Sequence, residues 1–69
     1  MENTIRELKD EMSALDTKIQ ILTGTIKNFN TNSEINQFQR EMMKLQLLSM
    51  RSYYRILTHR YNNLVGIEM

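Results

Sequence analysis

The chain has 69 residues, a formal net charge of +1 at pH 7, and neither cysteine nor proline. Its length allows one domain near the lower size limit for independent folding, and the lack of cysteine excludes disulfides and thiolate metal sites. So small a net charge provides no overall field that attracts nucleic acid. No apolar run approaches the roughly 20 residues of a membrane span, and the acidic, periodic start MENTIRELKDE differs from a signal peptide. We therefore expect a cytoplasmic protein without a membrane partner.

The first half of the chain predicts a long helix over about residues 4–28. Asn3 or Thr4 can cap its start. Apolar residues then follow at alternating steps of three and four: Ile5, Leu8, Met12, Leu15, Ile19, Leu22, Ile26 and Phe29. This spacing is a heptad seam, which is typical of a helix that packs lengthwise on another helix. Gly24 falls on the face opposite the seam, where it is either a tolerated glycine near a helix end or a point of close approach for a partner or ligand.

A polar stretch at about residues 29–32 predicts a turn, because asparagines tolerate left-handed backbone conformations and cap helices. Thr31 and Glu34 have the spacing of a capping box, so we expect a second helix over about 33–65, with Gly66 as its C-terminal stop. Its own heptad seam contains seven residues: Met43, Leu47, Met50, Tyr54, Leu57, Tyr61 and Leu64. A short connection between two such helices predicts an all-α fold, an antiparallel hairpin that forms a single domain over 1–69.

The second helix has more apolar surface than one partner helix can cover. A second stripe follows the same spacing and consists of Ile35, Phe38, Met42, Leu45, Ser49, Ser52 and Ile56. The alternatives are one broad core face or two separate interfaces, and the small size of the chain favours two. The serines would let another backbone come close, so we expect the hairpin to assemble into a helical homo-oligomer.

The second helix also carries the candidate binding residues. Gln46, Tyr53 and Arg60 are seven apart on one flank of its seam, and Lys44, Arg51 and Arg55 lie on the other, with no carboxylate from residue 42 to residue 67. Arginine pairs with phosphate, tyrosine stacks on bases, and glutamine reads base edges. We therefore select Gln46, Arg51, Tyr53, Arg55 and Arg60 as ligand-binding candidates. The alternative is that these side chains form hydrogen bonds across an oligomer interface.

Nothing in the sequence indicates catalysis. There is no cysteine nucleophile and no glycine-rich phosphate loop. His59 could be combined with Ser49 and Ser52, but an orienting acid on that face is missing. A single histidine and scattered carboxylates also make a metal site unexpected. We expect a binding protein with no catalytic residue, no metal and no cofactor.

One pattern in the second helix resembles that of a known group of proteins. It consists of Gln46, Leu47, Met50, Tyr53, Leu57 and Arg60. The chain is similar to small helical-hairpin proteins of tailed phages, including crAss-like phages, whose C-terminal helix has this pattern. In size and plan it is more distantly similar to phage sponge proteins that block CBASS and Thoeris immunity. The resemblance implies a homo-oligomer that sequesters a cyclic nucleotide or a cyclic ADP-ribose isomer, but it carries no site residue over to this chain.

These observations lead to three hypotheses about function. The first is a phage-encoded anti-defence sponge that binds a small anionic nucleotide, but no duplex nucleic acid, in the cytoplasm of the infected bacterial host. The second is a protein-binding inhibitor of a host defence protein, similar to an anti-CRISPR. The third is a structural coiled-coil component of the virion.

Overall fold

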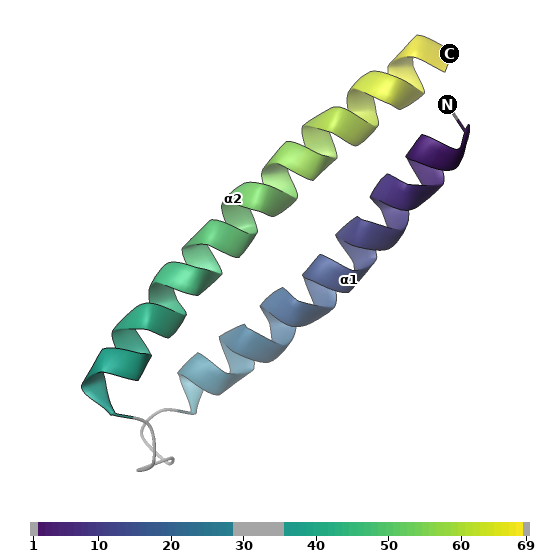
Figure 1. The fold of residues 1–69 in the computed structure, drawn as a ribbon. Coiled ribbons are helices and arrows are strands. Elements are labelled where there is room, and N and C mark those ends of the chain that lie inside the picture. The colour runs from purple at the N-terminus through teal and green to yellow at the C-terminus, as the bar shows by residue number, and fades with distance from the viewer. Residues whose placement is uncertain (1, 29–35, 69) are drawn as a thin grey trace.

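In the computed structural model, the chain forms two long antiparallel helices that lie side by side (Figure 1). The structure describes residues 2–28 and 36–68. Helix α1 spans Glu2–Lys27 and helix α2 spans Gln37–Glu68. The two chain ends lie at the same end of the molecule (Figure 1), whose longest dimension is 51 Å. This length matches a 32-residue helix at about 1.5 Å per residue. The predicted all-helical hairpin is confirmed.

Helix α1 begins earlier than the sequence suggested. It includes Glu2, so Asn3 and Thr4 lie inside the helix and the prediction that either one caps it is wrong. Three threonines of α1 donate their hydroxyls to the carbonyl four residues before them: Thr17, Thr23 and Thr25. These bonds satisfy polar side chains within a helix that has low intrinsic propensity around Gly24. At the end of the helix, the backbone amide of Asn28 reaches the carbonyls of both Gly24 and Thr25, each at 3.2 Å.

Helix α2 is capped by Asn36. The Asn36 Oδ1 atom accepts a hydrogen bond of 2.8 Å from the backbone amide of Gln39, and the Asn36 carbonyl accepts one of 3.0 Å from Arg40. Both bonds are typical of an N-cap residue. The predicted turn at 29–32, the capping box of Thr31 and Glu34, and the predicted start at residue 33 lie outside the described residues.

At its other end, α2 continues past the predicted stop. Gly66 is helical and has no positive φ, and the helix extends to Glu68. The prediction that Gly66 ends the helix is therefore wrong. A glycine ends a helix only where the backbone turns into the left-handed region, and the backbone at this glycine stays helical.

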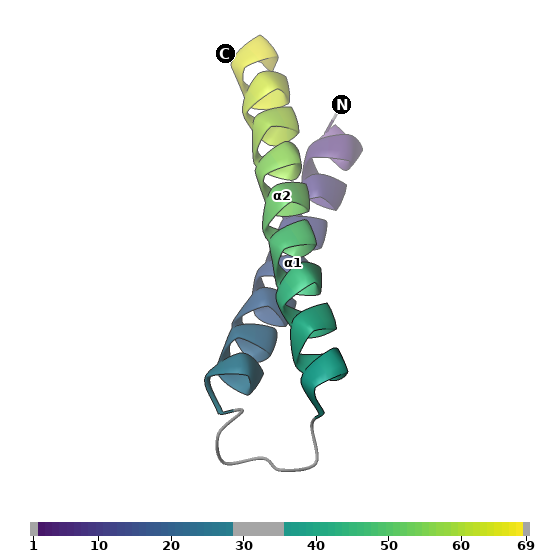
Figure 2. The ribbon, with the colours of Figure 1, turned by 90° about the vertical axis from the view of Figure 1, so that its left-hand side faces the viewer.

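The core is a narrow seam between the two helices, which cross along their length (Figure 2). Its buried residues are Leu8, Leu15, Leu47 and Leu57. Half-buried residues of both helices surround them, among them Met12, Ile19, Met50, Tyr54, Tyr61 and Leu64. Every described residue that the spacing assigned to the two seams is buried or half-buried. That the whole of 1–69 is one domain remains a prediction.

Candidate anion-binding surface

The five predicted binding residues are all exposed, but they do not form one site within a single chain. At 100° per residue, Gln46, Tyr53 and Arg60 share one edge of α2, next to α1. Arg51 lies on the opposite edge. Arg55 is one turn from Arg51 but lies further round the helix, toward the outer face. The five residues therefore lie on two different edges of α2.

The edge that contains Gln46, Tyr53 and Arg60 is partly occupied by an acid from α1. The Tyr53 hydroxyl donates a hydrogen bond to Glu11 Oε1 and so connects the two helices. This bond raises the pKa of Tyr53 above its ordinary value of 10.0, with smaller contributions from desolvation and from the Glu11 charge, while Arg60 acts in the opposite direction. A carboxylate in the middle of this edge opposes the binding of an anion there.

Gln46 lies beside a shallow groove on the same edge. The groove has a volume of about 250 Å³ and is lined by Lys18, Ile21, Leu22, Thr25, Gln46 and Met50. Most of its lining is apolar or neutral, with the Lys18 ammonium as its one cation. Gly24 does not line it, and a Cβ atom built on Gly24 would meet no atom within 4 Å. Within the hairpin Gly24 is therefore a tolerated glycine, and a close approach by a separate partner or ligand stays a prediction.

The opposite edge has a groove that the residue spacing did not predict. It has a volume of about 270 Å³ and is lined by Lys9, Met12, Ser13, Asp16, Tyr54 and Tyr61. The two tyrosines belong to the apolar seam, which is why their spacing indicated packing only. Lys9 and Asp16 are also seven residues apart, and that spacing could have indicated a polar edge that faces the tyrosines.

Arg51 and Arg55 form a positive surface on α2. These exposed arginines are one turn apart and lie in a stretch of α2 that has no carboxylate between Glu41 and Glu68. Among the described residues, neither arginine makes a hydrogen bond or an ion pair. Two adjacent guanidinium groups without a partner acid suit a phosphate, which they can bind through paired hydrogen bonds.

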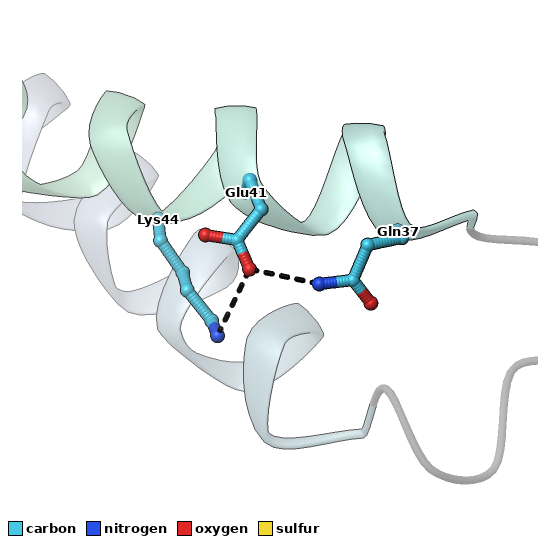
Figure 3. Close-up of polar contacts among 3 residues, drawn as sticks. All are labelled: Gln37, Glu41 and Lys44. Carbon is cyan, nitrogen blue, oxygen red and sulfur yellow. Dashed lines mark hydrogen bonds and ion pairs between the residues drawn. The ribbon is translucent and has the colours of Figure 1, made fainter.

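Lys44 continues this positive surface toward the start of α2, where a carboxylate balances it. Its Nζ atom lies 3.8 Å from Glu41 Oε1, and the same oxygen accepts a hydrogen bond of 3.1 Å from Gln37 Nε2 (Figure 3). All three side chains are exposed. An ion pair of this kind contributes little to stability and can rearrange when a ligand binds.

The part of the chain that the structure describes offers neither a metal site nor a membrane span. Residues 2–28 and 36–68 contain no group of three histidine, cysteine or acidic side chains that could hold a metal ion. Neither described helix is long and apolar enough to span a membrane.

The fold and this surface together define a class of protein: a two-helix hairpin with an exposed basic face on one helix. The family comparison is more specific. The model of the Sequestin family matches residues 2–63, which is most of the chain, and the protein belongs to that family. No curated protein and no solved structure matches the chain.

Proposed function

We propose that this protein binds and sequesters a small anionic nucleotide, of the cyclic-nucleotide type that serves as an immune signal, without converting it chemically. In this proposal it is a phage-encoded anti-defence protein that acts in the cytoplasm of the infected bacterial host. Membership of the Sequestin family is the observation that carries the proposal, because the family name denotes sequestration. The Arg51 and Arg55 surface supplies the chemistry for an anion.

The charge distribution favours a compact ligand over duplex nucleic acid. The formal net charge is only +1, and between residues 42 and 67 the basic residues are Lys44, Arg51, Arg55 and Arg60. A protein that follows a duplex neutralises many phosphates along its backbone, which needs an extended basic surface. Two neighbouring arginines can instead hold one or two phosphates of a small molecule.

The surroundings of the predicted binding residues support different roles for them. Arg51 and Arg55 have no acidic neighbour on α2, whereas Tyr53 is hydrogen-bonded to Glu11 on the other edge. We therefore assign phosphate binding to Arg51 and Arg55. Gln46, Tyr53 and Arg60 would then contact the base or ribose of a ligand that extends over α2, or belong to a second surface.

Calorimetry with cyclic dinucleotides, cyclic trinucleotides and cyclic ADP-ribose isomers tests this proposal. At least one should bind, and Arg51→Ala or Arg55→Ala should weaken binding about ten- to a hundredfold, as expected for a lost charge-assisted hydrogen bond. Arg6→Ala on α1 removes the same charge at an exposed residue away from this surface and is the control. No binding below about 100 μM by any of these ligands would contradict the proposal.

A second measurement separates sequestration from catalysis. The bound nucleotide should be recovered chemically unchanged when the protein is unfolded by heat, and chromatography of the released ligand checks this. A stoichiometric ligand released intact supports sequestration. Steady conversion of excess ligand into a product would show that the protein is an enzyme.

The alternative function is inhibition of a host defence protein by direct binding. The observation that favours it is the exposed apolar surface of α2, which includes Phe38, Leu45 and Ile56. A stable complex with one defence protein, reconstituted from the two purified proteins, would support this alternative if all the nucleotides fail to bind.

A further inference from the structure

The outer face of α2, which points away from α1, is apolar and uncovered. Phe38 is 64% exposed, and Leu45 and Ile56 are each 54% exposed. Met42, Ser49 and Ser52 are also exposed and complete the outer stripe, which comprises Phe38, Met42, Leu45, Ser49, Ser52 and Ile56. The core that the hairpin does bury is small, and a chain of this size usually needs a further source of stability.

We propose that the outer stripe packs against the outer stripe of a second copy of this chain, antiparallel, with the two-fold axis level with Leu47. The six stripe residues are placed symmetrically about position 47. An antiparallel pair centred there therefore opposes every stripe residue with another stripe residue. The opposed pairs are Phe38 with Ile56, Met42 with Ser52, and Leu45 with Ser49, and each pair occurs twice.

The side-chain sizes fit this register. In the two pairs nearest the two-fold axis, a large side chain of one copy meets a small serine of the other, so that Leu45 packs over Ser49 and Met42 over Ser52. Alternating large and small residues lets two helices approach closely without leaving voids. At the axis itself, Leu48, which is 59% exposed in the single chain, meets Leu48 of the second copy.

The charges beside the stripe favour the antiparallel orientation. In the proposed register, Glu41 of one copy lies beside Arg55 of the other, so opposite charges meet at two points between the copies, while Arg51 keeps no acidic neighbour and remains the arginine open to a phosphate. A parallel pair of the same helices would instead place Arg55 beside Arg60 of the second copy, twice. Like charges at such positions are unfavourable and select against that arrangement.

The mass and geometry of the pair can be measured together. Light scattering should give twice the chain mass of 8.3 kDa. The chain has no cysteine, so Gln46→Cys and Asn62→Cys each carry one spin label per chain. In the proposed pair, the labels at position 46 should lie within about 20 Å of each other, and those at position 62 about 45 Å apart. A monomer at 100 μM, or equally short distances at both positions, would overturn the proposal.

A charge swap tests the register. Glu41→Arg alone and Arg55→Glu alone should each weaken the dimer about tenfold, because each places like charges together at two points. The double variant restores opposite charges and should return the dimerisation constant to within about threefold of the wild-type value. Circular dichroism confirms that each variant remains helical. If the double variant is as weak as the single ones, Glu41 and Arg55 do not meet and the register is wrong.

Discussion

Helix α2 has two apolar faces with the same residue spacing and opposite surroundings. On the inner face, Leu57 is fully buried and Leu47 is 9% exposed against α1. On the outer face, Leu45 and Ile56 lie more than half exposed although they are equally apolar. The difference shows that a heptad pattern identifies a surface suited to helix packing but does not identify which helix covers it.

Placing a charge on each face in turn gives the largest expected difference in stability between the two faces. Leu57→Asp buries an unpaired carboxylate in the centre of the core and should unfold the hairpin, at a cost of about 3–5 kcal/mol or more. Ile56→Asp, one residue away on the outer face, should leave the chain helical. Circular dichroism and thermal melting distinguish the two results. If Ile56→Asp also unfolds the dilute protein, the hairpin is not stable without a partner on its outer face.

Removing a side chain instead of adding a charge sharpens the same comparison. Leu47→Ala creates a cavity in the seam and should cost about 2–5 kcal/mol. Its neighbour Leu48 is exposed, so Leu48→Ala should change the stability of the unassociated hairpin by less than about 0.5 kcal/mol. Urea denaturation at submicromolar protein concentration measures both values. Equal losses for the two substitutions would show that the inner and outer faces are not distinct.

The outer face of α1 is expected to tolerate added bulk. Gly24 is helical, and a Cβ atom there would meet nothing within 4 Å. Gly24→Ala should therefore stabilise the hairpin by about 0.5–1 kcal/mol, since alanine has the higher helix propensity. Gly66→Ala near the end of α2 is the matched control and should have a smaller effect. If Gly24→Ala is destabilising or abolishes nucleotide binding, a partner or ligand approaches α1 at this residue.

The smallest expected effect is the pH dependence of the contact between Tyr53 and Glu11. The pKa of Tyr53 is raised above 10.0 in the fold, so this tyrosine holds its proton more tightly in the folded chain than in the unfolded chain. Its contribution to stability is therefore present at neutral pH and is lost as the pH rises through the raised pKa. Thermal melting between pH 8 and pH 11 should show a steeper loss for the wild type than for Tyr53→Phe.

Absorbance of the ionised tyrosine provides a direct control for that prediction. The difference between the titration of the wild type and that of Tyr53→Phe isolates this one group. Glu11→Gln should move its midpoint back toward 10.0, because the hydrogen bond from Tyr53 to the carboxylate is the largest cause of the shift. An unchanged midpoint would show that Glu11 does not contact Tyr53 in solution.

The sequence by itself determined the helical hairpin and the residues of its seam. Apolar residues at steps of three and four lie on one face of a helix, so Leu8, Leu15, Leu47 and Leu57 could be assigned to lengthwise seams from their spacing alone. Helix ends were harder to predict, because several neighbouring residues could cap α2. Asn36 does so, with a bond to the amide of Gln39.

Only the tertiary structure decided how the candidate binding residues are distributed. Gln46, Tyr53 and Arg60 share an edge by spacing alone, but the sequence could not show that Glu11 reaches Tyr53, since the two are 42 residues apart. That contact depends on the register in which α1 packs on α2, and the register follows from how the seam side chains interlock. Among the described residues, the same register forms no ion pair between an acid of α1 and either Arg51 or Arg55, so the packing of the helices decides which polar side chains of α2 are engaged by α1.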